Sequence, residues 1–188
     1  MRIIAGAWRG RPLKAPEGKD TRPTADRVRE ALFSMLTSRL GSFEGLRVLD
    51  GFAGTGALGL EALSRGAAHC HFIEPDIAAS KILSQNIKAL NASATMLACR
   101  MEALPRAAVP VDLVLLDPPY EQGLAAPALA RLAEQGWLSP ATLISLESSR
   151  KETLDLPGFE TLKVRDHGKA RVHLLVARSI SGISAEQA

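Results

Sequence analysis

Between residues 46 and 146 the chain alternates short apolar runs with longer segments of helical periodicity. Short continuous apolar runs are typical of strands buried on both faces, and apolar residues spaced by three and four positions are typical of helices. The expected strands are 46–49, 71–73, 95–98, 113–116 and 142–146, and the expected helices are 57–65, 76–90 and 124–134. Two further runs, 160–166 and 171–177, flank Gly168 and predict a hairpin. This order predicts an α/β fold whose mostly parallel, doubly wound sheet has antiparallel strands at one edge.

The residues before this alternation form a separate region. Short extended segments around Gly6 and Gly10 predict a small hairpin, and apolar residues at helical spacing predict a helix that ends near Leu40. We therefore expect an N-terminal extension over 1–42 and an α/β domain over 43–178. The small, polar residues 179–188 predict a flexible tail.

The charge is concentrated at the N-terminus. Residues 1–40 hold nine Lys or Arg against four acids, so this segment carries +5 and the remainder carries −2, which gives the total of +3. A basic segment on a mildly acidic body indicates a polyanionic partner, although a solvated surface explains the charge equally well.

Composition excludes several classes of protein. The chain has 46% hydrophobic and 23% charged residues, as an ordinary globular protein does, and no apolar run approaches the roughly 20 residues of a membrane span. Its two cysteines, Cys70 and Cys99, have no metal-binding or disulfide-framework spacing, and no metal is expected. The N-terminus has no apolar signal core, so we expect a cytoplasmic protein, and no spare apolar stripe predicts an oligomer.

A glycine-rich turn, Asp50–Gly56, follows the first expected strand. Glycines at a strand-to-helix turn let a ligand approach the backbone, and Glu74 at the end of the next strand is placed to accept hydrogen bonds from ribose hydroxyls. Such a turn suits a nicotinamide dinucleotide, S-adenosylmethionine or close packing. Asp50 favours S-adenosylmethionine, since an acid there repels a pyrophosphate but attracts an ammonium or sulfonium group. Gly59 completes the dinucleotide spacing and leaves that alternative open.

The tetrad Asp117-Pro118-Pro119-Tyr120 follows the expected strand 113–116. Prolines hold the chain extended and leave the preceding carbonyls free to accept hydrogen bonds. Asp117 and the Pro118 carbonyl can accept both hydrogens of a planar amine, which favours a pyramidal nitrogen with an available lone pair. Tyr120 offers a stacking face for a base that has left its helix. The tetrad therefore predicts group transfer to an exocyclic amine, with guanine N2, adenine N6 and cytosine N4 all open.

These motifs together resemble the RsmD family, bacterial S-adenosylmethionine-dependent methyltransferases of class I that act on N2 of a guanine in 16S rRNA. The specific segments are 2–6 with 8–11, and 22–30; the more general ones are 50–56 with 58–59, and 117–120. The resemblance implies a Rossmann-like, seven-stranded sheet and a basic N-terminal hairpin that approaches RNA. The expected substrate is 16S rRNA, within a small-subunit assembly particle, and the expected enzyme is a monomer. A non-catalytic RNA-binding assembly factor is the alternative from another class.

The motifs, the charge distribution and the resemblance together assign residues to roles. The expected catalytic residues are Asp117, Pro118, Pro119 and Tyr120. The expected contacts to S-adenosylmethionine are Asp50, Phe52, Ala53, Gly54, Thr55, Gly56, Glu74, Pro75 and Glu102. The expected RNA contacts are Arg2, Arg9, Arg11, Lys14, Arg22, Arg27 and Arg29.

Two observations qualify these assignments. Arg27 and Arg29 lie two residues apart and do not share a helical face, so at least one of them is expected to be structural. Gly51 replaces a larger apolar residue of the family, which is expected to loosen the turn.

Overall fold

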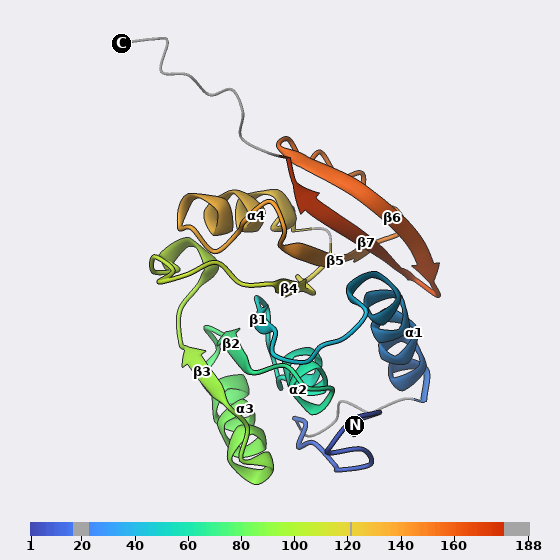
Figure 1. The fold of residues 1–188 in the computed structure, drawn as a ribbon, viewed down its shortest axis with the longest axis vertical. Helices are drawn as coiled ribbons and strands as arrows, with labels where there is room; N and C mark the ends of the chain where they lie inside the picture. The colour runs from blue at the N-terminus through green and yellow to red at the C-terminus, as the bar shows by residue number, and fades with distance from the viewer. Residues whose placement is uncertain (17–22, 121, 179–188) are drawn as a thin grey trace.

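A computed structural model describes residues 1–16, 23–120 and 122–178 (Figure 1). The helices are α1 (Pro23–Leu40), α2 (Ala57–Ser64), α3 (Ile77–Leu90) and α4 (Ala125–Glu134), with a 3-10 turn, η1 (Met101–Ala103). The strands are β1 (Arg47–Asp50), β2 (His69–Ile73), β3 (Ala94–Leu97), β4 (Leu113–Leu116), β5 (Leu143–Ser149), β6 (Phe159–His167) and β7 (Ala170–Ala177). Each strand and helix predicted after residue 46 is present, with ends shifted by a few residues.

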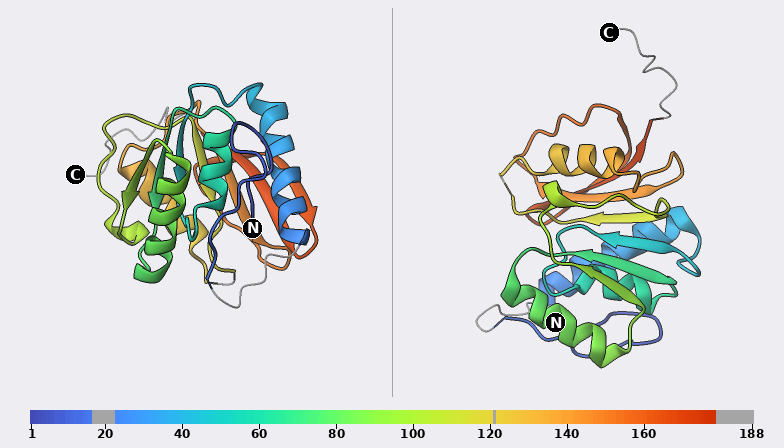
Figure 2. Two further views of the ribbon diagram at one scale, coloured as in Figure 1. Left: turned by 90° about the horizontal axis from the view of Figure 1, so that it is seen from below. Right: turned by 90° about the vertical axis from the view of Figure 1, so that its left-hand side faces the viewer.

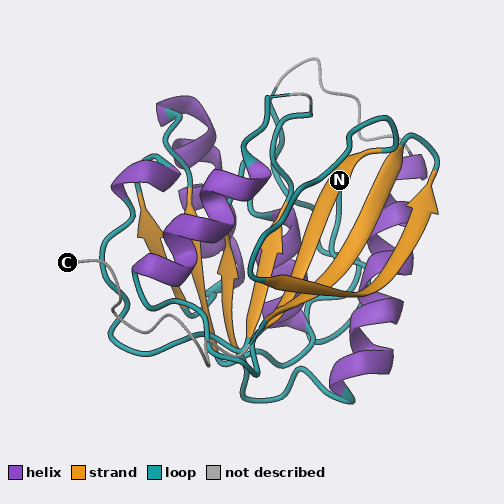
Figure 3. Cartoon of the chain, turned by 90° about the horizontal axis from the view of Figure 1, so that it is seen from above, coloured by secondary structure: helices purple, strands orange, loops and turns teal. Residues whose placement is uncertain are grey.

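The seven strands form one sheet in the order β3-β2-β1-β4-β5-β7-β6. The first five strands in this order are parallel, whereas β7 runs antiparallel to both β5 and β6. Figure 3 shows these strands side by side with helices packed against them. The predicted doubly wound sheet with an antiparallel edge hairpin is confirmed. The order reverses between β1 and β4, and the carboxyl ends of strands at such a point are where open α/β sheets bind ligands.

Helices lie on both sides of the sheet (Figure 2), and a hydrophobic core covers each of its faces. The first core joins α1, α2 and α3 to the sheet through residues such as Phe33, Leu60 and Leu83. The second core packs Leu129 and Leu132 of α4 against the opposite face. Gly59 of α2 lies so close to β2 that an added Cβ atom would come within 2.3 Å of the Phe72 ring. A glycine is therefore needed there for packing.

The N-terminal segment takes the predicted hairpin path in a reduced form. Its strand pairing consists of a single antiparallel bridge, between Arg2 and Pro12. Backbone hydrogen bonds such as Ile3 N to the Arg11 carbonyl at 2.9 Å hold its two arms together, and Ala7 N ties it to α2 by donating to the Ser64 carbonyl at 2.7 Å. Gly6 has a φ of 82°, and a Cβ atom there would meet the same carbonyl oxygen at 1.8 Å. The segment therefore lies directly on the helix that follows the glycine-rich turn.

Strand β5 is longer than predicted. The apolar pattern ends at Leu146, but pairing with β7 continues to Ser149 opposite Ala170. Polar residues belong to the strand because their backbone groups form hydrogen bonds with the neighbouring strand. The local sequence does not reveal this pairing. The extension includes Glu147 in the strand.

Candidate active site at the carboxyl ends of the strands

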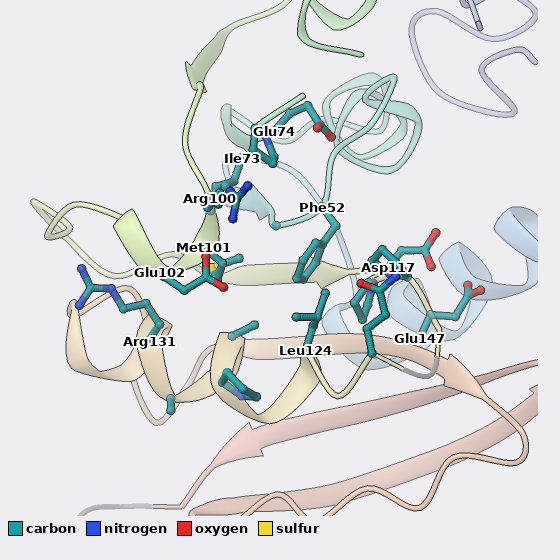
Figure 4. A pocket seen from close by; sticks show the side chains of 18 of the residues that line it. Phe52, Ile73, Glu74, Arg100, Met101, Glu102, Asp117, Leu124, Arg131 and Glu147 are labelled. Carbon is teal, nitrogen blue, oxygen red and sulfur yellow. The ribbon is translucent and has the colours of Figure 1, made fainter. Parts of the chain in front are cut away.

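A cavity of about 1050 Å³ opens at the carboxyl ends of β1, β2, β4 and β5 (Figure 4). Residues at these strand ends line the cavity because the carboxyl ends of parallel strands meet at one edge of the sheet. Eight of the predicted site residues line it: Phe52, Glu74, Pro75, Glu102, Asp117, Pro118, Pro119 and Tyr120. The structure thus brings together the expected catalytic tetrad and part of the expected cofactor site.

Asp50 lies beneath the turn, and its side chain is 1% exposed. Its Oδ2 accepts a hydrogen bond from Gly59 N at 2.9 Å, while Oδ1 has no partner among the described residues. Burial, with a smaller contribution from the charge of Glu74, raises the pKa of Asp50 to about 7, although the bond from Gly59 opposes this. The residue is therefore a buried acid with one unsatisfied oxygen.

Glu74 connects the end of β2 to the glycine-rich turn. Its Oε2 accepts from Gly54 N at 2.7 Å, and its Oε1 accepts from Asp76 N at 2.8 Å. The carboxylate is held in one orientation at the cavity wall by these two bonds. A rigid carboxylate at this place fits the expected contact with ribose hydroxyls.

Residues 53–56 of the turn, which are expected cofactor contacts, do not line the cavity. Ala53 N donates to the Ile73 carbonyl at 3.1 Å, and Gly56 N donates to the Ala53 carbonyl at 2.7 Å. The Thr55 carbonyl accepts from the Asn86 side chain at 3.0 Å. Gly51 lines the cavity, and a Cβ atom there would come within 2.4 Å of the Leu116 side chain. Leu116 thus occupies the space that a larger side chain at position 51 would need.

The tetrad forms the other wall. Asp117 is accessible from the cavity, yet the surrounding protein removes enough water to raise its pKa to about 7, with help from the charges of Glu147 and Asp50. Pro118 is buried, and Tyr120 is 40% exposed. The Tyr120 hydroxyl donates to Oε1 of Glu147, which fixes the ring. Burial and this bond raise the pKa of Tyr120 well above its ordinary value.

Glu147 is a cavity residue that the sequence analysis missed. It comes directly after the apolar run that predicts β5, as Asp50 and Asp117 follow or end theirs. An acid directly after a buried apolar run is therefore the sequence signal that could have identified Glu147 as a cavity residue. Asp117 and Glu147 lie at one end of the cavity, and Glu102 and Arg131 lie at the other (Figure 4).

The expected RNA contacts divide into exposed and buried residues. Arg2, Arg9, Arg11, Lys14 and Arg27 are exposed, and Arg22 lies outside the described residues. Arg2, Arg9 and Arg27 also line a second cavity, of about 530 Å³.

Arg29, in contrast, is 6% exposed, and its guanidinium contacts other residues of the chain. Its guanidinium donates to the Arg2 carbonyl and to Asp26, and lies 3.9 Å from Glu61. These contacts attach the N-terminal segment to α1 and α2, so Arg29 is the structural member of the pair with Arg27. The expectation that it contacts RNA does not suit this burial.

In the described parts of the chain, no helix is both long and apolar enough to cross a membrane. Nor do the His, Cys, Asp and Glu side chains there form a group of three or more that could hold a metal ion.

Comparison with known proteins identifies a matching family and several relatives. The model of the family described as conserved hypothetical protein 95 matches residues 1–176. The ribosomal RNA small subunit methyltransferase D of Escherichia coli (strain K12) is 43% identical over 150 residues, which cover 79% of this chain and 74% of that protein. Its counterpart in Haemophilus influenzae is 39% identical over 86% of each chain.

Solved structures agree. The Escherichia coli protein yhhF superposes with a TM-score of 0.82 at 36% identity, covering 95% of this chain and 98% of its own. The Thermus thermophilus 16S rRNA N2 G1207 methyltransferase (RsmC), solved with AdoMet and guanosine, has a TM-score of 0.62 at 26% identity, covering 86% of this chain and 45% of its own. From the span of the family match and the identity to these relatives, the chain belongs to the conserved hypothetical protein 95 family, which is the RsmD family predicted from sequence.

Proposed function

We propose that this protein transfers a methyl group from S-adenosylmethionine to the exocyclic N2 of a guanine in 16S rRNA. The observation that carries the proposal is the shared cavity, in which Asp117 and Pro118 of the tetrad face the same space as Glu74 and Phe52. The relatives named as small-subunit rRNA methyltransferases support the enzyme class and the rRNA substrate. Guanine 966 as the target and cytoplasmic action as a monomer on an assembling particle belong to the proposal as its finer parts.

The residues of the cavity fit S-adenosylmethionine. Among the described residues, none of the ion pairs involves Glu74 or Asp117, so these two cavity acids suit a ligand with positive charge. Glu74, Phe52, Pro75 and Glu102 would hold the cofactor at the wall, with Asp50 and the 53–56 turn behind them. When bound, S-adenosylmethionine supplies an activated methyl group.

The chain's own residues prepare the amine. An exocyclic amine is a weak nucleophile because its lone pair is delocalised into the ring. The Asp117 carboxylate and the Pro118 carbonyl would accept its two hydrogens and favour a pyramidal nitrogen. Tyr120, whose hydroxyl is held by Glu147, would stack on the flipped base. Asp117 would also receive the proton that the nitrogen loses.

The test uses rRNA and small-subunit particles from cells that lack the protein. The purified enzyme with labelled S-adenosylmethionine should yield N2-methylguanosine on nucleoside mass spectrometry, and mapping of the product should place it at one guanine. N6-methyladenosine or N4-methylcytidine as the sole product would replace the proposed base with another. Absence of product on every substrate, with RNA binding retained, would favour a non-catalytic assembly factor.

A further inference from the structure

Asp117 and Glu147 occupy matching positions on neighbouring strands. Leu116, the last residue of β4, pairs with Leu146 of β5 in parallel register, and the residue that follows each of these leucines is an acid. Neighbouring strands lie roughly 4.8 Å apart. The two carboxylates therefore enter the same end of the cavity side by side (Figure 4).

Glu147 keeps one oxygen available to a ligand. Its Oε1 accepts the Tyr120 hydroxyl, whereas Oε2 takes part in none of the hydrogen bonds found among the described residues. Among the described residues, Glu147 also forms no ion pair. The side chain is half-buried and lines the cavity, which is the space that a base would enter.

The chemistry of the three candidate bases differs at the atom beside the amine. Guanine carries an N1–H donor next to its N2 amine, whereas adenine and cytosine carry an unprotonated ring nitrogen next to theirs. A carboxylate accepts hydrogen bonds and donates none when ionised. A second carboxylate beside Asp117 thus matches guanine and repels the lone pair of the other two bases.

We propose that Glu147 selects guanine by accepting a hydrogen bond from its N1–H while Asp117 and the Pro118 carbonyl hold the N2 amine. This inference rests on the proposed function and supplies the base specificity that the tetrad lacks. Glu147 acts as a contact to the base, and its bond to Tyr120 places the stacking ring and the recognition group together. The charge of Glu147 also contributes to the raised pKa of Asp117, which agrees with their proximity.

The test compares guanine with 2-aminopurine at the methylated position of 16S rRNA in reconstituted particles. 2-Aminopurine keeps the 2-amino group but has a lone pair at N1 in place of the N–H. The kcat/KM of the wild-type enzyme should be about tenfold to a hundredfold higher for guanine than for 2-aminopurine, which is the range for one specific base contact. In Glu147→Gln the side-chain amide donates to N1 of 2-aminopurine, so the preference should fall by about tenfold or more. The absence of O6 in 2-aminopurine affects both enzymes alike and cancels in this ratio.

Three controls decide the interpretation. Glu160→Gln removes a carboxylate from an exposed position of β6 and should leave the preference unchanged. Tyr120→Phe removes the hydroxyl that Glu147 holds; an equal fall in preference there would show that Glu147 acts only through the ring, and would overturn the proposal. An unchanged preference in Glu147→Gln, with cofactor affinity and urea midpoint like those of the wild type, would also overturn it. If the wild-type enzyme makes no N2-methylguanosine at all, the proposed function fails, and this inference falls with it.

Discussion

The acids that hold the N-terminal segment and the acids at the strand ends differ in what neutralises them. Glu61 is fully buried and accepts from Arg65 Nε at 2.9 Å, Ile4 N at 2.7 Å and Ala5 N at 3.0 Å, with Arg29 nearby. Asp50 is equally buried, yet its Oδ1 has no partner among the described residues. Both acids lie within one strand-turn-helix unit.

The difference separates an acid whose charge is neutralised inside the protein from acids that lack such partners. A buried carboxylate is tolerated when cations and N–H groups satisfy it, as at Glu61. Where these partners are missing, burial raises the pKa instead, as at Asp50 and Asp117, and such groups gather at functional sites. Substitutions of Glu61 should therefore act on stability, and substitutions of Asp117 should act on the reaction.

The largest expected effect is on turnover. Asp117→Ala removes the acceptor for one amine hydrogen, and we expect kcat to fall by about 10³-fold, the upper end of the reduction for loss of one preorganised electrostatic contact. Cofactor affinity measured by calorimetry should change little. Asp155→Ala, at an exposed position in the loop after β5, is the matched control and should keep full activity. Turnover by Asp117→Ala within tenfold of the wild type would remove Asp117 from the reaction.

The next effect is on folding. Glu61→Gln keeps the shape of the side chain but leaves Arg29 and Arg65 without a buried counter-charge, so we expect a decrease of about 3 kcal/mol in the free energy of unfolding. Urea denaturation with an unchanged m-value measures it. Glu134→Gln breaks the exposed pair with Arg131 and should cost less than about 1 kcal/mol. Equal decreases in the two variants would show that Glu61 is no structural anchor.

The third effect is a pH dependence from Asp50. Its pKa is raised from 3.8 to about 7 by folding, so the folded state binds more protons between these values and the unfolded state binds fewer. The stability that this group contributes is full below about pH 4 and is lost as pH rises through about 7.

Replacing the acid removes this dependence. We compare the unfolding free energy of Asp50→Asn with that of the cofactor-free wild type at each pH. The difference, variant minus wild type, should increase by on the order of 2 kcal/mol from pH 5 to pH 8. Asp155→Asn, an exposed substitution, should show no such trend. Parallel stability curves for Asp50→Asn and wild type would mean that Asp50 does not titrate in this range.

How much of this was predictable depends on how local each feature is. The strands and the tetrad follow from runs of adjacent residues such as Leu113–Leu116 and the four residues after them. Helical spacing showed that Arg27 and Arg29 point differently, but which of them is buried depends on Glu61, more than thirty residues away. The hydrogen bond of Asp50 to Gly59, and the pairing that carries β5 past Glu147, also require the folded chain.

A smaller effect concerns the link between the N-terminal segment and the turn. The Asn86 side chain accepts from Lys14 N at 2.8 Å and donates to the carbonyls of Lys14 and Thr55. Asn86→Ala leaves these backbone groups unsatisfied, and we expect a decrease of about 2 kcal/mol in unfolding free energy. Gln85→Ala, the preceding residue of α3, removes only an exposed contact with Lys14 Nζ and should cost less than about 0.5 kcal/mol. Indistinguishable urea midpoints for the two variants would contradict the link.

The smallest expected effect tests the exposed arginines against the buried one. Arg9 and Arg11 are exposed, so the double variant Arg9→Glu/Arg11→Glu should fold like the wild type but bind rRNA about tenfold more weakly. The slope of log affinity against log salt should become shallower by about 1 for each phosphate that these arginines no longer neutralise. Lys163→Glu/Arg165→Glu makes the same charge change on exposed positions of β6. If both double variants weaken RNA binding equally, RNA responds only to net charge, and the N-terminal segment is then an anchored structural element without a recognition surface.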